Sequence, residues 1–391
     1  MSQQSVTMAD VAKAAGVSRT TVSFVLNGRM ESSIPETTRE RINQTARELG
    51  YRPNAAARTL ASKRSSWFGL VTEIATSPFA TDVIKGAQQA AWKDGNFLLI
   101  APSDDDPGMD NLAVEKLLEQ QVGGLIIATS WHRQITVPEN AKTVPCVLVN
   151  CFDAGGQLPS IVPDEFGGGY AAAEILAKAG HTSIGHITLK TGIPAQIGRQ
   201  AGMKQALRDH GIEFDDSRIV PGDGTADSGY HGTQTLLSQL DPPTAIFCGN
   251  DRIAMGAYDA IKERGLQVGK DISIVGFDDQ EILAPHMRPK LTTIALPFEE
   301  LGMAGVSLLN QMVEGSPIEN RQITIGCPPA FVRLWPCTAA DELPLRYTSH
   351  EWMRNFNDNQ ILTSCAPCRG RDRCGRHPRL ERMRRIESRR N

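Results

Sequence analysis

The larger part of the chain, from Trp67 onward, alternates short apolar runs with amphipathic stretches. The apolar runs are typical of parallel strands covered on both faces by helices. They lie at 68–74, 97–101, 125–129, 146–150, 184–188, 245–249, 272–277 and 291–296. The amphipathic stretches predict helices at 82–93, 110–121, 167–179, 198–210, 228–240, 252–264 and 298–314. This alternation predicts a doubly wound α/β body with parallel sheets, and about eight strands are too many for one ordinary lobe, so two lobes are expected.

The first part of the chain shows a helical period instead. Residues 7–28 read TMADVAKAAGVSRTTVSFVLNG, in which a glycine separates two short amphipathic stretches. Thr7 is a suitable N-cap, and Asp10 stands three positions later, where a carboxylate meets the positive helix end. Gly16 suits the end of the first helix, and Ser18 can cap the second. The spacing predicts a helix-turn-helix, whose second helix can lie in the DNA major groove.

Polar side chains gather on the outer face of the second predicted helix. They are Arg19, Thr20, Thr21 and Ser23. An arginine can bond two acceptors of one guanine, and threonines can meet a thymine methyl group or a phosphate. A plain surface helix pair would carry the same polar face, so this motif taken alone leaves both interpretations open.

A third amphipathic stretch over 34–49 predicts another helix, which Gly50 ends. The next segment, 51–62, reads YRPNAAARTLAS, and Asn54 can cap a short helix over 55–61. Such a helix is too short to persist alone in water. We expect it to fold when it is docked on DNA and on a second copy of itself.

Charge divides the chain at the same places. Residues 1–64 hold ten Lys and Arg against five Asp and Glu, a net charge of +5. Residues 65–333 hold 19 against 32, a net charge of −13, and residues 334–391 hold 12 against 7, a net charge of +5. A basic head on an acidic body predicts that phosphate contacts are confined to the N-terminal part.

Composition argues against several protein classes. No run approaches the roughly 20 apolar residues of a membrane helix, so no membrane partner is expected. The first twenty residues lack the basic start and apolar run of a signal peptide, which predicts a cytoplasmic protein. In that reducing compartment the eight cysteines are expected to be free thiols, with Cys146, Cys151 and Cys248 as small core residues.

Polar residues stand directly after several predicted strands. Asn150, Asn250 and Asp278 each follow an apolar run, and Arg199 is expected to begin the helix after the 184–188 strand. Ligands of such sheets bind at the carboxyl ends of the strands. Amide, carboxylate and guanidinium groups that converge between two lobes can hold the hydroxyl groups of a small polar molecule.

Each of these residues has a structural alternative. For Asp251, which opens a helix after a strand, capping is the favoured interpretation, whereas ligand contact is favoured for Asp278 and Arg199. Phe79 and Phe298 could stack on the apolar face of a ligand or pack in the core.

From Thr7 to about Arg333 the chain resembles the lac repressor/galactose repressor family of bacterial transcription factors. The resemblance rests on the helix-turn-helix segment together with ETTRERINQTARELGYRPNAAARTL, GHTSIGHIT, GRQAGMKQAL, PTAIFCGNDRIAMGAYDAIKERGLQVGKDISIVGFDD and LTTIALPFEELG. It implies a homodimer, with a tetramer left open, that binds a pseudo-palindromic operator in double-stranded DNA. A small-molecule effector in the cleft would control it. Effectors in the family are commonly sugars and sometimes nucleobases, and a sugar is expected here.

The resemblance also implies roles for single residues. The DNA contacts that it implies are Thr7, Ser18, Arg19, Thr20, Thr21, Ser23, Asn27, Tyr51, Asn54, Ala57, Arg58 and Leu60. Leu60 matches a hinge leucine that enters the minor groove and kinks the operator. The expected effector contacts are Phe79, Asn150, Arg199, Asn250, Asp278 and Phe298. Two positions depart from the family: Phe24 stands where an arginine is frequent, and Gly224 stands where several relatives carry a stacking aromatic residue.

The expected architecture is a small all-α head on a two-lobed body like that of periplasmic binding proteins. Its parts are the helix-turn-helix domain 1–53, the hinge helix and linker 54–64, the body 65–333 and a tail 334–391. Lobe one is expected at about 65–163 plus 292–320, and lobe two at about 164–291 plus 321–333.

The tail departs from the family pattern after Arg333. It contains no lysine and twelve arginines, ten of them in 369–391. One interpretation is a zinc site with a short loop, made by Cys365, Cys368, Cys374 and His377. A second is a basic arm that adds nonspecific DNA affinity. The third, which we favour, is a translated frame shift of the ordinary family C-terminus, and disorder is expected in this segment.

Three classes of function compete for this sequence. An effector-controlled transcriptional regulator, expected to be a repressor, is favoured. A solute-binding protein for transport would share the two-lobed body, but it would need an export signal, and the basic head contradicts it. An enzyme is disfavoured because His132, His181, His186 and His210 fit no catalytic or metal-binding spacing. We therefore expect neither enzyme activity nor a cofactor.

Overall fold

The computed structural model describes residues 6–26, 34–52, 65–73, 81–103 and 106–330. The predicted hinge helix over 55–61 and the tail 334–391 lie outside these described residues.

The head is a helix-turn-helix followed by a third helix, as predicted. Its helices are α1 (Met8–Ala15), α2 (Arg19–Leu26) and α3 (Glu36–Glu48). Thr7 and Asp10 form a reciprocal capping box at the start of α1, and Gly16 ends that helix with a φ of 65°. The three helices bury Val11, Val22 and Ile42 completely, so each contributes to one small core.

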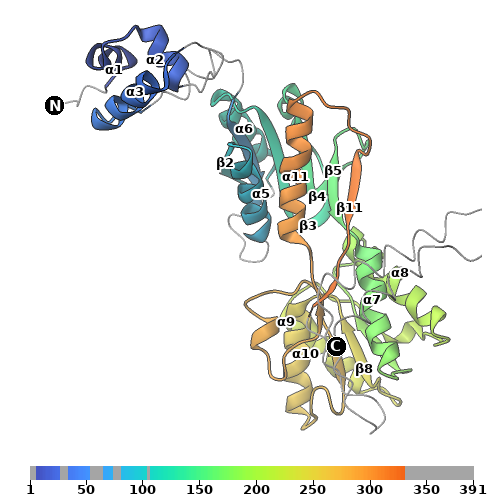
Figure 1. The fold of residues 1–391 in the computed structure, drawn as a ribbon. Helices are drawn as coiled ribbons and strands as arrows, with labels where there is room; N and C mark the ends of the chain where they lie inside the picture. Colours follow the sequence, from blue (N-terminus) through green and yellow to red (C-terminus); the bar gives the residue numbers. More distant parts are fainter. Residues whose placement is uncertain (1–5, 27–33, 53–64, 74–80, 104–105, 331–391) are drawn as a thin grey trace, which may run out of the picture. The chain divides into compact units, whose positions relative to one another are not determined.

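The first sheet of the body is six-stranded and parallel, in the order β11-β5-β4-β3-β1-β2. Its strands are β1 (Trp67–Thr72), β2 (Phe97–Pro102), β3 (Gly124–Ile135), β4 (Cys146–Asp153), β5 (Ser160–Pro163) and β11 (Gln322–Ile325). The helices α5 (Thr81–Lys93) and α11 (Phe298–Val313) cover one face, and α6 (Pro107–Glu119) covers the other (Figure 1). Neighbouring residues of β1 show both faces in use, because Leu70 packs under α5 and α11 whereas Val71 packs under α6.

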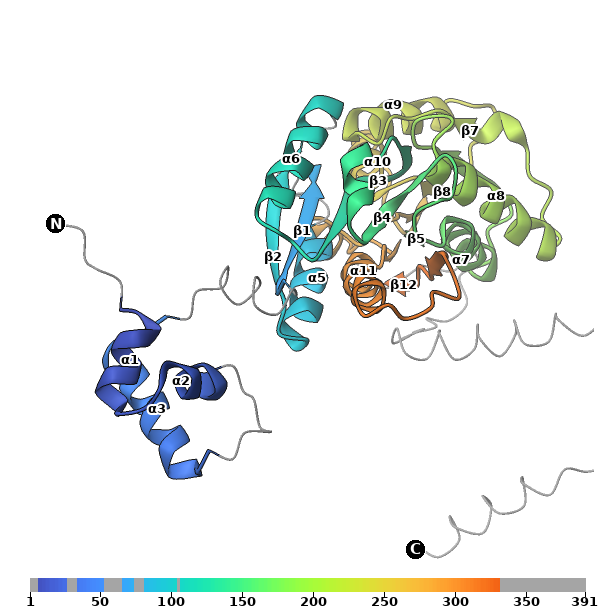
Figure 2. The ribbon, with the colours of Figure 1, turned by 90° about the horizontal axis from the view of Figure 1, so that it is seen from above.

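The second sheet is four-stranded and parallel, in the order β7-β6-β8-β9. Its strands are β6 (Ile184–Ile187), β7 (Ile219–Val220), β8 (Ala245–Cys248) and β9 (Ser273–Val275). The helices beside it are α7 (Glu165–Lys178), α8 (Pro194–Asp209), α9 (Ala226–Leu237) and α10 (Asp251–Glu263) (Figure 2). Leu236 of α9 and Ile253 of α10 pack on Ile246 of β8, which places these two helices on one face. The two doubly wound sheets confirm the predicted α/β fold with two lobes.

The remaining elements are short. They are the 3-10 helices η2 (Glu139–Thr143), η3 (Asp216–Arg218) and η4 (Ala284–His286) and the strands β10 (Thr293–Ile294) and β12 (Pro329–Ala330). Within the described residues, no helix combines the length and the apolar character that crossing a membrane requires. Four cysteines lie in this part of the chain, and all four are free and buried: Cys146, Cys151, Cys248 and Cys327.

Strand pairing corrects two details of the predicted lobe boundaries. Thr292 and Ala295 pair with Val275 and Asp278, so this stretch stays with the second sheet rather than joining lobe one at residue 292. Conversely, β11 pairs with β5, so residues 322–325 belong to the first sheet and not to lobe two. The burial of β11 alternates along the strand, and it therefore lacks the continuous apolar run that marks the other strands.

Candidate functional site

A cavity lies where the carboxyl ends of β3 and β4 meet residues of α7, α8, α10 and the loop after β9. It holds no more than about 490 Å³ of empty space, part of it open to solvent. It is lined by Ser130, Trp131, His132, Asn150, Glu165, Ala195, Arg199, Asn250, Arg252, Asp278, Gln280, Leu296 and Phe298. Five of the six predicted effector contacts are thus brought together, and the sixth, Phe79, lies outside the described residues.

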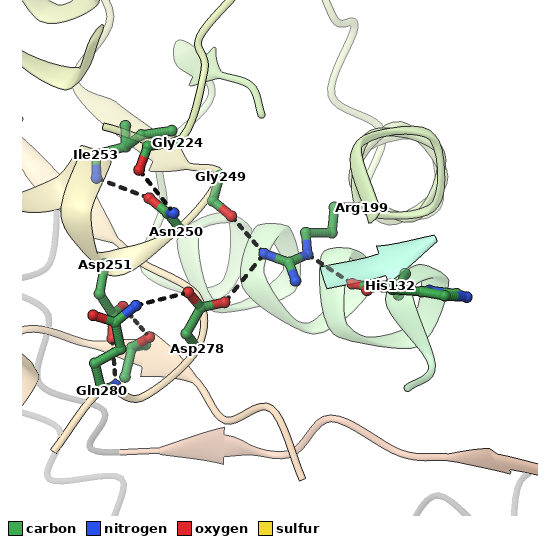
Figure 3. Close-up of polar contacts among 11 residues, drawn as sticks. His132, Arg199, Gly224, Gly249, Asn250, Asp251, Ile253, Asp278 and Gln280 are labelled. Atoms are coloured by element: carbon green, nitrogen blue, oxygen red, sulfur yellow. Dashed lines mark hydrogen bonds and ion pairs between the residues drawn. The ribbon is translucent and has the colours of Figure 1, made fainter. Parts of the chain in front are cut away.

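Arg199 is the central cation of this cavity, and its side chain is only 3% exposed. Its Nε donates to Glu165 Oε2 at 2.7 Å, and its Nη1 donates to the Gly249 carbonyl at 2.6 Å (Figure 3). Nη1 also lies 3.4 Å from Asp278 Oδ1, and the guanidinium carbon stands 3.5 Å from the centre of the Phe277 ring. Burial opposes the charge of Arg199, but the neighbouring carboxylates outweigh burial and raise its pKa. The residue is therefore a fixed cation.

Close helix packing fixes the position of Arg199. The residue lies in the second turn of α8, which begins at Pro194, so the expectation that Arg199 begins its helix is wrong. A Cβ at Gly169 would overlap the Arg199 carbonyl, and one at Gly202 would overlap the Phe166 carbonyl. Only glycines let the backbones of α7 and α8 approach so closely. The glycine-rich start of α7 thus serves helix packing.

Glu165 at the start of α7 is the main counter-charge of Arg199. Its side chain is buried, and burial alone would raise its pKa, but the charge of Arg199 together with hydrogen bonds from His132 and Arg199 outweighs burial and lowers the pKa. Its second oxygen, Oε1, lies 3.4 Å from His132 Nδ1. Sequence reasoning missed Glu165 because it follows β5, a four-residue strand that the apolar pattern did not reveal.

A second pair of carboxylates is formed by the buried Asp251 at the start of α10 and the partly buried Asp278 in the chain after β9. Burial raises the pKa of Asp278 to about 6, although the Arg199 charge partly opposes this shift. Burial, strengthened by the charge of Asp278, also raises the pKa of Asp251. Asp251 accepts hydrogen bonds from Thr293 Oγ1 at 2.6 Å and from the Gln280 backbone N–H at 2.8 Å.

Asp251 does not cap α10, contrary to the interpretation favoured from the sequence. The cap is Asn250, whose Oδ1 accepts from the Ile253 N–H at 2.9 Å. The Asn250 Nδ2 group donates to the Gly224 carbonyl at 3.1 Å (Figure 3). Asp251 is the first helical residue, and its carboxylate turns toward β10 and the chain after β9.

Two amide side chains leave an oxygen without a partner in the cavity. Asn150 Nδ2 donates to the Thr129 carbonyl at 2.9 Å, and Gln280 Nε2 donates to Asp278 Oδ2 at 3.1 Å. Asn150 Oδ1 and Gln280 Oε1 are buried and have no hydrogen-bond partner. Because an unmet buried acceptor costs free energy, both oxygens favour a ligand that donates hydrogen bonds.

Sequence reasoning also missed the segment Ser130, Trp131 and His132. The predicted strand ended at residue 129, but β3 continues to Ile135 through an irregularity in its register with β4. A strand predicted from its apolar pattern ends where the apolar run is followed by polar residues. The pattern therefore could not predict residues 130–135 of β3.

The head presents polar side chains at the start of α2. Ser18, Arg19 and Thr20 are exposed, and Thr21 and Ser23 are partly exposed. Ser18 Oγ accepts from the Thr21 N–H at 3.1 Å, which confirms the predicted cap. Tyr51 packs against the core of the head. The other predicted DNA contacts lie outside the described residues: Asn27, Asn54, Ala57, Arg58 and Leu60.

The described residues contain no cluster of His, Cys, Asp and Glu that could hold a metal ion. The predicted tail ligands Cys365, Cys368, Cys374 and His377 lie outside them. The other histidines named from the sequence have partners elsewhere in the body: His181 bonds Thr244 and Ser273, His186 bonds the Phe247 carbonyl at 2.9 Å, and His210 bonds the Ala206 carbonyl at 2.9 Å.

Two family models match this chain, one in the head and one in the body. A model described as bacterial regulatory proteins, lacI family, matches residues 7–54. A model described as a periplasmic binding protein-like domain matches residues 173–333.

Whole-chain relatives agree with these models. The ribose operon repressor of Haemophilus influenzae is 34% identical over 327 residues, which are 84% of this chain and 97% of that protein. The HTH-type transcriptional repressor PurR of Serratia proteamaculans is 35% identical over 311 residues, 78% of this chain and 90% of that protein.

Solved structures share the fold. A crystal structure of the lac repressor dimer bound to operator and the anti-inducer ONPF has a TM-score of 0.70 and 30% identity, covering 84% of this chain and 98% of that one. A complex of the transcriptional regulator CelR with cellobiose has a TM-score of 0.60 and 27% identity, covering 83% of this chain and 98% of that one.

Proposed function

Because this chain belongs to the lacI family of bacterial regulatory proteins, we propose that it is a dimeric repressor whose operator affinity is set by a neutral sugar bound in the cavity around Arg199. Its function as a DNA-binding transcriptional regulator follows from its relatives, which are named as transcriptional repressors. Those relatives give no support to a role in solute transport.

The observation that carries the sugar proposal is the balance of charge and hydrogen-bonding groups in the cavity. Arg199 already faces Glu165 and Asp278, so it has no uncompensated positive charge to offer to a phosphate or carboxylate ligand. Among the amide side chains that line the cavity, Asn150 Oδ1 and Gln280 Oε1 are acceptors without a hydrogen-bond partner. A sugar hydroxyl donates one hydrogen bond and accepts others, so several hydroxyl groups can satisfy these amides and also accept from Arg199.

A nucleobase is the second candidate, because the family resemblance implies that effectors are sometimes nucleobases. Its donors and acceptors lie in one plane and at fixed spacing, whereas the cavity acceptors come from β4 and from the loop after β9. A polyol with hydroxyl groups on several carbons meets acceptors from different directions more readily than a planar ring. The sugar is therefore favoured.

The head supports the DNA-binding half of the proposal. Arg19 and Thr20 are exposed in the first turn of α2, where side chains of a recognition helix reach base edges. Ser18 and Thr21 hydroxyls bond each other at 2.8 Å, which fixes the start of the helix. We assign Arg19 to a base contact and the surrounding hydroxyls to positioning on phosphate. Leu60 is assigned to the minor-groove wedge on the family resemblance.

Sugar binding would control the operator affinity of the head by closing the two lobes around the sugar. Cavity residues come from both sheets, since Asn150 lies in β4 of the first and Asp278 follows β9 of the second. A ligand that binds both sides favours the arrangement in which both contacts form. It can shift operator affinity only by its differential affinity for the two arrangements.

Two steps test this proposal on the full-length protein. First, bound duplexes are selected from a random pool, and a consensus sequence with two-fold symmetry is expected. Second, thermal unfolding is followed with D-ribose, D-glucose, D-galactose, D-fructose, D-xylose, hypoxanthine and guanine, each added separately. We expect one sugar to raise the unfolding temperature and to change the affinity for the selected duplex. A response to a purine alone would contradict the sugar assignment, and selection without any consensus would contradict sequence-specific DNA binding.

A further inference from the structure

The segment Ser130–His132 lies in the second half of β3, at the irregularity in its register with β4, and hydrogen bonds to Glu73 flank it. The Ser130 N–H and Oγ both donate to Glu73 Oε1, at 2.7 Å and 2.6 Å. Arg133 donates to both Glu73 oxygens, at 2.9 Å and 2.8 Å. Burial would raise the pKa of Glu73, but Arg133 and Ser130 outweigh it and lower the pKa, so the anchor is charged at neutral pH.

This anchoring presents Trp131 to the cavity. The Thr129 hydroxyl donates to the Trp131 carbonyl at 2.8 Å, which ties the backbone of the segment to the end of the buried strand. The indole lines the cavity and is 38% exposed, so part of its surface is available to a bound molecule.

The ring edge of Trp131 meets the second lobe at a residue without a side chain. Gly224 has a φ of 88°, which L-residues rarely adopt, and a Cβ there would lie 3.2 Å from Trp131 Cη2. The guanidinium of Arg252 stands 5.5 Å from the Trp131 ring. The space that a side chain at position 224 would need is therefore taken by an indole that comes from the first sheet.

We propose that Trp131 is the specificity-determining aromatic residue of the effector site and stacks on the apolar C–H face of a monosaccharide ring. The assignment rests on the sugar-controlled repressor proposed above. The hydroxyl groups of the same sugar donate hydrogen bonds to Asn150 and Gln280 and accept hydrogen bonds from Arg199. Pockets for small ligands combine an aromatic surface with a few placed polar groups in this way.

Hydrogen bonds to Glu73 hold the backbone on both sides of Trp131 before a ligand binds. A segment that is already ordered loses little conformational freedom when the ligand arrives, so more of the contact free energy appears as affinity. Because Trp131 is carried by the first sheet, stacking on it also connects the ligand to that sheet, while Arg199 and Gln280 hold the ligand from the other side.

The test compares Trp131→Ala and Trp131→Phe with the unaltered full-length protein. Calorimetric titration uses each of the five sugars named above. We expect Trp131→Ala to weaken binding of the responding sugar at least tenfold, about 1.4 kcal/mol. Trp131→Phe retains an aromatic face and is expected to bind within about threefold of the unaltered protein.

Tryptophan fluorescence separates stacking from a merely structural role. Trp92 on α5 is 60% exposed and does not line the cavity, so Trp92→Ala is the matched control. Sugar should change the emission of the unaltered and Trp92→Ala proteins but not that of Trp131→Phe. Circular dichroism checks that each variant is folded.

The outcomes distinguish this assignment from the function on which it rests. Equal sugar affinity of unaltered and Trp131→Ala proteins would overturn the Trp131 assignment alone, as would an emission change that persists in Trp131→Phe. Binding of none of the five sugars to the unaltered protein would overturn the proposed effector class and this assignment with it.

Discussion

Replacing Arg199 by alanine should destabilise the body as well as abolish the response to sugar. Arg199 and Glu165 are both nearly inaccessible and lie 2.7 Å apart, and Asp278 is the second carboxylate near the guanidinium. Alanine removes the cation but leaves the buried carboxylates. Removing one partner of such a pair costs about 3–5 kcal/mol because the remaining charge is uncompensated. For a body of this size the unfolding temperature should fall by about 10 °C.

The pH dependence of the stability lost in Arg199→Ala shows whether the uncompensated carboxylates cause that loss. In the unaltered protein Arg199 lowers the pKa of Glu165, so Glu165 contributes stability above its ordinary pKa of 4.5, and this contribution is lost as the pH falls through the lowered value. Without Arg199, burial dominates and the folded-state pKa of Glu165 rises above 4.5. The ionised carboxylate then destabilises the variant at pH 7, and protonation relieves the penalty as the pH falls. The stability gap between the two proteins should therefore narrow from pH 7 to pH 5.

Thermal unfolding of the full-length proteins at pH 7 and pH 5 measures both effects. The control is the double variant Arg199→Met with Glu165→Gln, which removes both charges and should regain at least half of the lost stability while remaining unresponsive to sugar. Equal unfolding temperatures of Arg199→Ala and unaltered protein at pH 7 would contradict a stabilising role of the Arg199 charge, and so would a difference in unfolding temperature that stays constant with pH.

Three further changes probe other parts of the molecule. Thr7→Ala removes the reciprocal cap of α1, and amide exchange within α1 should become about fivefold faster, whereas unchanged exchange would show that the cap is dispensable. His186 is fully buried, and burial lowers its pKa from 6.5 to about 4, so the folded protein loses stability as the pH falls through that window. His186→Gln should flatten this part of a plot of unfolding temperature against pH, and an unaltered slope would assign it to other groups. Leu60→Ala should weaken binding to the selected duplex while the unfolding temperature of the body stays the same, and unchanged DNA affinity would contradict the wedge role.

The fold could be predicted where an element carries its own period. The strands predicted at 97–101 and 146–150 are continuous apolar runs and are found as β2 and β4, over Phe97–Pro102 and Cys146–Asp153. β4 is buried along most of its length, as such a run requires, whereas the edge strand β2 leaves Phe97 and Ile100 exposed. β11 and β12 could not be found this way, since they are short and half-exposed and are defined by their partners rather than by their own residues. The lobe boundaries that depend on them were misplaced for the same reason.

The cavity could be predicted where a polar residue directly follows a strand. Asn150 and Asp278 were found because the carboxyl ends of parallel strands meet at one edge. Glu165 was missed because it follows the short strand β5, and Trp131 was missed because β3 continues beyond its apolar run. Both strands are completed by pairing with distant segments, which a local period cannot show.

Sugar-controlled operator binding is tested by the affinity of the full-length protein for its selected duplex as the responding sugar is added, with a scrambled duplex as reference. We expect the selected duplex to bind at least about a thousandfold more tightly than the scrambled one. We also expect saturating sugar to change the affinity for the selected duplex by at least about fivefold. Equal affinity for both duplexes, unaffected by sugar, would contradict sugar-controlled operator binding.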